Sequence, residues 1–179
     1  MTNVRDVTGV LLVGGASRRF GSPKALAEFG GSSLAERAWN LVGEAFATRL
    51  AIGKTADALA LPFPLLNDGT EVRAPIAGVV AGLRAAQTDV CVFLPVDVPL
   101  MTVEALRELA ARCRDAAVPQ TGPLPGAYRR SALPILARRL KAGALALRDA
   151  LSELDVDVVE LNAKLLVNVN VPEDLERLA

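Results

Sequence analysis

Histidine is absent from this chain of 179 residues, and cysteine occurs only twice. Without histidine the chain lacks the usual general base near neutral pH and the commonest zinc ligand. Cys91 and Cys113 lie far apart and form no CxxC pair, so we expect two buried, inert thiols. Any chemistry must depend on carboxylates, Lys, Arg, backbone dipoles and a hard cation. This inventory suits phosphoryl or nucleotidyl transfer, in which positioning and charge neutralisation do most of the catalysis.

An excess of charge and long apolar runs are also missing. The 20 Lys and Arg residues balance the 20 Asp and Glu residues and are spread along the chain, which argues against nucleic acid or a membrane as partner. No run approaches the roughly 20 apolar residues of a membrane span, and residues 1–9 lack a signal-peptide pattern. We therefore expect a cytoplasmic protein with a small-molecule substrate, folded as one domain over residues 1–179.

Hydrophobic strands and amphipathic helices alternate along the chain. Residues 8–13 are apolar and β-branched and then stop at Gly14-Gly15, which predicts a buried strand followed by a tight loop. Further strands are predicted over residues 49–52, 63–66, 90–94, 116–118, 126–128 and 156–161, and helices over 33–48, 75–86, 102–114, 131–140, 144–151 and from Pro172 onward. This alternation predicts an α/β fold with a mostly parallel central sheet.

The loop after the first strand combines glycines with cations. In open α/β sheets, ligands bind at the carboxyl ends of the strands. Glycine lets backbone amides approach a phosphate, and Arg and Lys neutralise its charge. We therefore expect Gly14 and Gly15 to contact a nucleotide and Arg19 and Lys24 to hold its phosphates, although a solvated turn is the alternative. Neither the GxGxxG fingerprint nor the Walker pattern is present, which excludes a dehydrogenase and a P-loop ATPase.

The same loop resembles the signature loop of the molybdenum cofactor nucleotidyltransferases, the MobA-like family. The resemblance lies in Leu-x-Gly-Gly-x-Ser-x-Arg-Phe-Gly-x-x-Lys-Ala-Leu, and Gly-Gly is typical of the guanylyltransferase branch. One departure is Pro23, which stands where the family usually has Asp. By this resemblance the GTP-binding positions are Leu12, Val13, Gly14, Gly15, Arg19 and Lys24.

Asp97 follows the most hydrophobic predicted strand, close to Pro99. A carboxylate held there by a rigid strand can bind Mg²⁺ through oxygen. Alternatively, Asp97 is a turn or N-cap residue. The segment resembles the Cys-Asp-x-Pro block of the family, with Val96 in place of Cys, and this resemblance implies that Asp97 is the Mg²⁺ ligand. The interpretation requires Lys24 and Asp97 to face one shared cleft.

Asp68 lies in an Asn-Asp-Gly sequence that is typical of a turn. The resemblance instead implies a place in the nucleotide site, because residues 74–78 after it are similar to the Gly-Pro-Leu-Ala-Gly helix start of the family. The amides of that helix start could also face an anionic substrate. Gly53 occupies a position where some relatives have Asn, so a side-chain contact is lost there.

Near the end of the chain, Asn168 and Asn170 share one side at strand spacing. Asn170 alternatively caps the last helix through its side chain. The string Asn-Val-Asn-Val-Pro-Glu-Asp-Leu resembles a family block, which implies that both asparagines face the pterin side of the cleft. Arg129 and Arg130 are candidates for contacting the pterin phosphate, or else are solvated.

The resemblance implies a three-layer Rossmann-like nucleotidyltransferase fold and a Mg²⁺-dependent guanylyltransferase. GMP would pass from GTP to the terminal phosphate of molybdopterin in its molybdenum-bound form, with release of pyrophosphate, and recipient molybdoenzymes would be further partners. The phosphate nucleophile is ionised near pH 7, so no base is required. The alternatives are a related cytidylyltransferase, a sugar- or lactyl-phosphate nucleotidyltransferase, and a non-catalytic nucleotide-binding module, for which Pro23 and the missing His are the best arguments.

Overall fold

The structure, a computed structural model, describes residues 6–14, 20 and 23–178. Its strands are β1 (Val7–Val13), β2 (Glu28–Phe29), β3 (Ser32–Ser33), β4 (Thr48–Gly53), β5 (Leu66–Asn67), β6 (Val90–Pro95), β7 (Ala116–Pro119), β8 (Gly126–Arg129) and β9 (Val156–Val159). Its α-helices are α1 (Leu34–Ala45), α2 (Pro75–Ala85), α3 (Val103–Arg112), α4 (Leu133–Lys141), α5 (Leu147–Ala150) and α6 (Pro172–Leu178).

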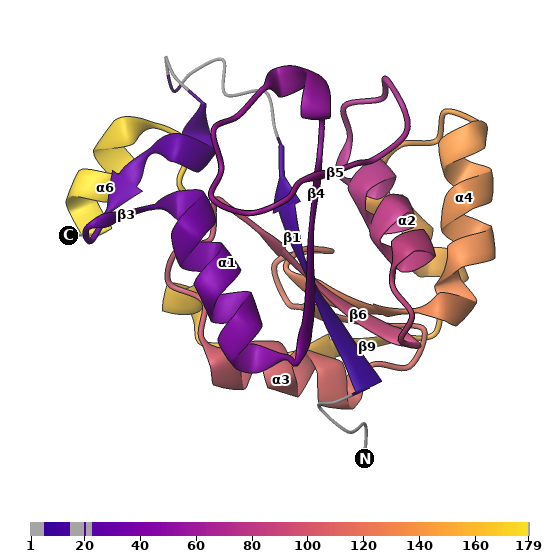
Figure 1. The fold of residues 1–179 in the computed structure, drawn as a ribbon. Coiled ribbons are helices and arrows are strands. Elements are labelled where there is room, and N and C mark those ends of the chain that lie inside the picture. Colours follow the sequence, from indigo (N-terminus) through magenta and orange to yellow (C-terminus); the bar gives the residue numbers. More distant parts are fainter. Residues whose placement is uncertain (1–5, 15–19, 21–22, 179) are drawn as a thin grey trace.

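Seven strands form one sheet in the order β5-β4-β1-β6-β8-β7-β9. Strand β8 runs antiparallel to both of its neighbours, and the other neighbouring pairs are parallel. Helices cover both faces of this sheet (Figure 1). The predicted α/β fold with a mostly parallel central sheet and three layers is therefore confirmed.

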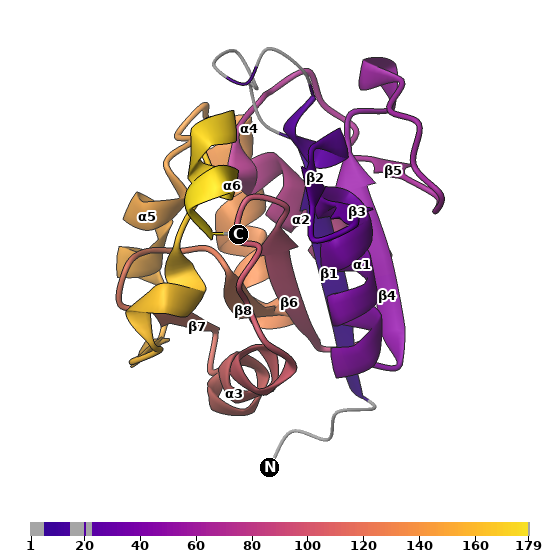
Figure 2. The same ribbon diagram turned by 90° about the vertical axis from the view of Figure 1, so that its left-hand side faces the viewer.

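The apolar side chains of β1 divide between two cores because successive residues of a strand point to opposite faces. Leu11 and Val13 pack with α1 and α3, whereas Val10 and Leu12 pack with α2, α4 and α5. All seven residues of β1 are buried. Figure 1 shows α1 on one side of β1 and β4 and α2 and α4 on the other, and Figure 2 looks onto the face that α1 covers. Burial on both faces explains why β1 reads as a nearly continuous hydrophobic run.

Helix α1 begins where the sequence offers a capping box. The Ser33 side chain accepts from the Glu36 N–H at 3.2 Å, and the Glu36 carboxylate accepts from the Ser33 N–H at 3.0 Å. The helix ends at Ala45, three residues before the predicted end, because the chain continues into β4. Thr102 caps α3, as expected from its position.

Three local features differ from what the sequence indicates. The strand predicted over residues 63–66 is reduced to the two residues of β5, since Pro62 and Pro64 cannot donate to a ladder. The β2-β3 hairpin, with Gly30 and Gly31 at positive φ, was not predicted. Residues 167–170 form no strand, although Asn168 and Asn170 are both exposed on either side of the buried Val169.

Both cysteines are free and buried, as expected. Burial raises the pKa of each thiol to about 12, which keeps both protonated. Among the residues that the structure describes, no helix is long and apolar enough to cross a membrane.

Candidate functional site

The carboxyl ends of β1, β4 and β6 open onto one cleft of about 570 Å³. Strands β4 and β6 flank β1, so the chain leaves β1 toward one side of the sheet and later returns to the other. Such a switch in strand order leaves a crevice in which α/β proteins bind ligands. Six of the residues predicted from the sequence line this cleft: Leu12, Val13, Gly14, Asp68, Asp97 and Asn168.

Lys24 and Asp97 meet beside the cleft, as the sequence interpretation requires. Lys24 begins a 3-10 turn, η2 (Lys24–Leu26), and its Nζ donates to Asp97 Oδ2 at 3.4 Å. The two side chains are 17% and 30% exposed, so a ligand can reach both. Pro23 precedes the turn with φ of −59°, a value that proline adopts without strain. The Pro in place of the family's Asp therefore fits the local backbone.

The C-terminal segment holds the backbone of Asp97. The Val169 N–H donates to the Asp97 carbonyl at 2.8 Å, and the Val169 side chain is fully buried against Phe20, Leu34 and Leu175. Helix α6 thereby reaches the same region as β6, far from it in sequence. Asn168 on this segment lines the cleft, whereas Asn170 is not among the described residues that line it.

Asp174 receives the backbone amides at the start of α6. Its Oδ2 accepts from the N–H groups of Asn170 at 2.8 Å and Val171 at 3.1 Å. These two bonds lower the pKa of the Asp174 carboxyl below its ordinary value, and the nearby charges of Arg177 and Lys24 act in the same direction. The carboxylate of Asp174, rather than the amide side chain of Asn170, thus makes the capping contacts of this helix start.

Asp97 is the candidate Mg²⁺ ligand that the sequence predicts. In the described part of the chain, no three His, Cys, Asp or Glu residues group into a metal site. A zinc cage is therefore absent from those residues, whereas Mg²⁺ commonly takes one carboxylate and completes its shell with water and substrate phosphates. The position of Asp97 after a buried strand and on the cleft wall fits that use.

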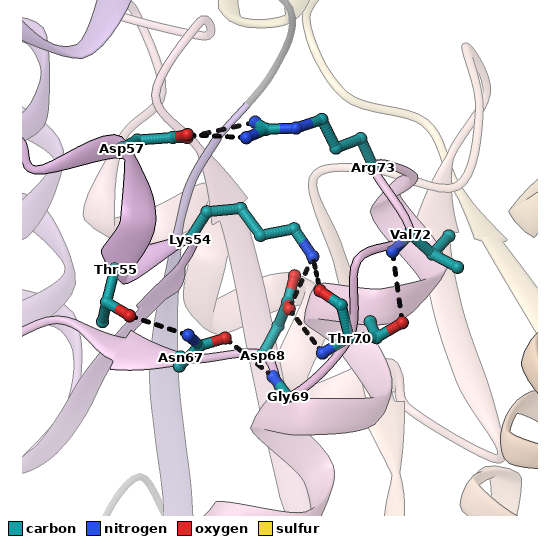
Figure 3. A network of polar contacts seen from close by, with 9 residues as sticks. All are labelled: Lys54, Thr55, Asp57, Asn67, Asp68, Gly69, Thr70, Val72 and Arg73. Carbon is teal, nitrogen blue, oxygen red and sulfur yellow. Dashed lines mark hydrogen bonds and ion pairs between the residues drawn. The ribbon is translucent and has the colours of Figure 1, made fainter.

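A buried ion pair lies at the tips of β4 and β5, on the same cleft (Figure 3). Lys54 Nζ donates to Asp68 Oδ1 at 2.7 Å and also to the Thr70 carbonyl. The side chains of Lys54 and Asp68 are only 10% and 7% exposed. Thr70 N–H also donates to Asp68 Oδ1, at 3.2 Å. Asp68 is therefore held by two donors inside the cleft wall.

Sequence reasoning missed Lys54. The signal available was a lysine directly after an apolar strand, at the edge of the sheet where Gly14 also lies. Gly53, just before it, explains the departure from the family: a Cβ there would lie 2.1 Å from the Val13 carbonyl oxygen. No side chain fits at residue 53, so the polar group on this wall comes from the next position.

A second ion pair lies above the first in Figure 3. Arg73 donates from both terminal nitrogens to the Asp57 carboxylate, at 2.7 and 3.2 Å. The hydrogen bonds from Arg73 lower the pKa of Asp57. This pair joins the 3-10 turn after β4, η3 (Thr55–Asp57), to the segment that leads into α2.

Arg129 and Arg130 lie at the opposite edge of the sheet, so the expectation that they contact the acceptor in this cleft is wrong. Because β8 runs antiparallel to β6, Arg129 pairs in register with Val90 at the amino end of β6. Arg129 binds Asp89, and Arg130 donates to the Ala86 carbonyl after α2. An arginine that does line the cleft is Arg148, on α5.

Two further predicted residues, Gly15 and Arg19, lie outside the described residues, so their predicted phosphate contacts stay predictions.

Comparison with known proteins identifies relatives over nearly the whole chain. A family model of the MobA-like NTP transferase domain matches residues 9–158. A protein from Deinococcus radiodurans, named "probable molybdenum cofactor guanylyltransferase", is 35% identical, with 97% of this chain and 94% of the relative covered. A protein of the same name from Chloroflexus aggregans is 32% identical, with 95% and 92% covered.

Solved structures share this fold. The molybdopterin-guanine dinucleotide biosynthesis protein A from Archaeoglobus fulgidus superposes with a TM-score of 0.80 at 26% identity, over 95% of both chains. The 2-C-methyl-D-erythritol 4-phosphate cytidylyltransferase from Thermus thermophilus superposes with a TM-score of 0.69 at 21% identity, over 94% of this chain and 95% of that one. The second likeness shows the fold alone.

Proposed function

Because the chain belongs to the MobA-like NTP transferase family, we propose that it is a Mg²⁺-dependent guanylyltransferase of molybdenum cofactor biosynthesis. It transfers GMP from GTP to the terminal phosphate of molybdenum-bound molybdopterin and releases pyrophosphate. Recipient molybdoenzymes then take the product. We propose that residues 1–179 act as one domain and work in the cytoplasm. The observation that carries this proposal is the meeting of Lys24 with Asp97 beside the cleft at the tips of β1 and β6.

Residues of this chain can stabilise the negative charge that develops during this reaction. The acceptor phosphate oxygen forms a bond to the α-phosphorus of GTP as the bond from that phosphorus to the α,β-bridging oxygen breaks in line. Lys24, with Arg19, stabilises the charge that develops on the leaving pyrophosphate. Asp97 holds Mg²⁺, which when bound neutralises charge on the reacting phosphates. The acceptor is already ionised near pH 7, so a chain without histidine can run this reaction.

The lining of the cleft offers further contacts for the acceptor. Asn168 and Arg148 both line it, and Arg148 Nη2 donates to the Thr121 carbonyl at 2.8 Å. That partner is a neutral carbonyl, and among the described residues no carboxylate forms an ion pair with Arg148, unlike Lys54 and Arg73. Gly122 leaves room for the guanidinium, since a Cβ there would lie 2.8 Å from Arg148 Nη2. We assign Arg148 to the acceptor phosphate.

Nucleotide binding and turnover test the proposal separately. Thermal unfolding with GTP, CTP and ATP, with and without Mg²⁺, reports binding because a ligand stabilises the form that binds it. We expect stabilisation by GTP and Mg²⁺, and pyrophosphate release when molybdopterin is added. Stronger stabilisation by CTP would instead indicate a cytidylyltransferase. GTP binding without pyrophosphate release from any phosphorylated acceptor would indicate a binding module.

A further inference from the structure

The loop between β7 and β8, residues 120–125, forms the part of the cleft wall next to Arg148. Four of its residues line the cleft: Thr121, Gly122, Pro123 and Leu124. We propose that Tyr128 and Gln120 are positioning residues for the acceptor, because they hold this loop and the loop in turn holds the guanidinium of Arg148. The inference rests on the proposed function, in which Arg148 contacts the acceptor phosphate.

The sequence of the β7–β8 loop limits the support that its own backbone can give. Pro123 and Pro125 have no N–H to donate. The Gly122 N–H donates to the Pro119 carbonyl at 3.2 Å, which closes a turn at the end of β7. A segment with few backbone hydrogen bonds keeps one conformation only where side chains or packing hold it. The position of the loop therefore depends on contacts with other elements.

Gln120 fastens the start of the loop to the segment after β9. Its Nε2 donates to the Leu161 carbonyl at 2.7 Å, and its Oε1 accepts from the Leu161 N–H at 3.1 Å. Strands β7 and β9 pair in parallel as far as Pro119 and Val159. A side-chain amide has both donors and an acceptor, so Gln120 extends this pairing beyond the last residues of the two strands.

Tyr128 holds the middle of the loop from β8. Its side chain is fully buried, and its hydroxyl donates to the Pro123 carbonyl at 2.7 Å. The ring packs edge-on against Phe93 on β6, with ring centroids 5.8 Å apart. Gly126 also packs against the same carbonyl, since a Cβ there would lie 2.6 Å from the Pro123 oxygen. These contacts fix the Pro123 carbonyl against the sheet.

The Thr121 carbonyl, between the two anchored positions, is the partner of Arg148. Arg148 Nη2 donates to it at 2.8 Å. Gly122 permits this close approach, since a Cβ there would lie 2.8 Å from the same nitrogen. Arg148 is an exposed residue of the four-residue helix α5, so burial does not hold its long side chain in place. A shift of the Thr121 carbonyl therefore moves the positive charge that meets the acceptor phosphate.

Positioning of this kind affects the acceptor and leaves the nucleotide unchanged. A cation that is held before the ligand arrives loses less entropy on binding. A misplacement of about 1 Å can cost roughly a hundredfold in rate. In the proposed function the GTP phosphates meet Lys24 and Asp97, which lie on other elements. Loosening the β7–β8 loop should therefore change the KM for the acceptor and not the affinity for GTP.

Tyr128→Phe is the decisive variant because it removes one hydroxyl and keeps the ring. In a pyrophosphate-release assay it should raise the KM for molybdopterin about tenfold, while the dissociation constant for GTP stays within about twofold of the wild type. Arg148→Ala should raise the same KM by at least as much. The double variant should be no worse than Arg148→Ala, because the hydroxyl acts through Arg148. A purely structural role of the hydroxyl predicts additive losses instead.

Gln120→Ala tests the other anchor. It should also raise the KM for molybdopterin, again without adding to the effect of Arg148→Ala. Gln87→Ala is its matched control, since Gln87 is exposed just before β6 and is not among the described residues that line the cleft. Thr8→Val is the control for deletion of a buried hydroxyl: Thr8 is fully buried near the amino end of β1, and its hydroxyl bonds to that of Thr88 at 2.7 Å. Both controls should leave the KM for molybdopterin unchanged, even where they lower Tm.

The outcomes separate this inference from the proposed function. If Tyr128→Phe and Gln120→Ala leave the KM for molybdopterin unchanged, or if their losses add to that of Arg148→Ala, the positioning role alone is overturned. The same holds if both variants weaken GTP as much as molybdopterin. Should Tyr128→Phe fail to fold, Gln120→Ala at its exposed site carries the same test. A wild type that releases no pyrophosphate from GTP and molybdopterin overturns both the inference and the proposed function.

Discussion

Replacing Asp97 by alanine should change the rate of turnover far more than the stability of the fold, because the carboxylate of Asp97 contributes little to stability. Within the part of the chain that the structure describes, its side chain makes one ion pair, with Lys24 at 3.4 Å. The side chains of Lys24 and Asp97 are 17% and 30% exposed. A partly exposed pair of this kind contributes about 0–1 kcal/mol. For a chain of this size, 1 kcal/mol corresponds to a change in Tm of about 2–4 °C. We therefore expect Asp97→Ala to unfold within about 4 °C of the wild type.

Turnover should respond far more strongly. If Asp97 holds Mg²⁺, its loss removes several kcal/mol of charge stabilisation in the transition state. About 4 kcal/mol corresponds to roughly a thousandfold fall in rate. The assay is pyrophosphate release from GTP with molybdopterin as acceptor, with GTP binding measured separately without Mg²⁺, where it should be retained. Near-normal pyrophosphate release by Asp97→Ala would refute the reasoning.

The matched control is Asp155→Ala. It removes a carboxylate from an exposed ion pair, with Arg114 at 3.1 Å, away from the cleft. The two side chains are 60% and 62% exposed, so Tm and turnover should both stay close to the wild type. A similar loss of activity in both variants would mean that the effect of Asp97→Ala is not specific to the cleft.

Three further predictions follow from packing and titration. Gly53→Ala should destabilise the protein by about 1–3 kcal/mol in urea unfolding, because its Cβ would lie 2.1 Å from the Val13 carbonyl oxygen and β1–β4 pairing holds both strands in place. Gly14→Ala is the control: its Cβ would meet no atom of the described residues within 4 Å, so it should leave the free energy of unfolding nearly unchanged. Because burial raises the pKa of Cys91 and Cys113 to about 12, neither should react with a thiol reagent at pH 8 until the chain is unfolded; rapid reaction of the native protein would contradict this burial. Asp174, whose pKa is lowered by two backbone N–H bonds, stabilises the fold above the unfolded carboxyl pKa of about 3.9, and this contribution is lost as the pH falls through the folded pKa. Asp174→Asn should therefore be less stable than the wild type at pH 7, with the difference shrinking below about pH 4; a difference independent of pH would argue against the linkage.

The strands, and the polar residues that follow them, could be predicted from local sequence. Buried parallel strands are apolar runs, and their carboxyl ends meet at one edge of a sheet. For that reason Gly14 and Asp97 could be placed at one edge of the sheet before any coordinates, and the meeting of Lys24 with Asp97 could be required in advance. The place of Asp68 in the cleft was implied by the family resemblance, since its local sequence is typical of a turn. Local signals also predicted the starts of α1, α2 and α3 to within one residue. What the sequence by itself determined was thus the α/β fold class and the residue types at the tips of the strands.

Only the tertiary structure decided which other polar residues lie on the cleft at the carboxyl ends of the strands. The reversed direction of β8 carries Arg129 and Arg130 to the opposite edge of the sheet, and no local pattern encodes the direction of a strand. The contact between Gly53 and the Val13 carbonyl shifts the polar position on the β4 wall to Lys54. The α5 helix brings Arg148 to the cleft from far along the chain. Each of these depends on contacts between segments distant in sequence, and residue spacing alone does not specify such contacts.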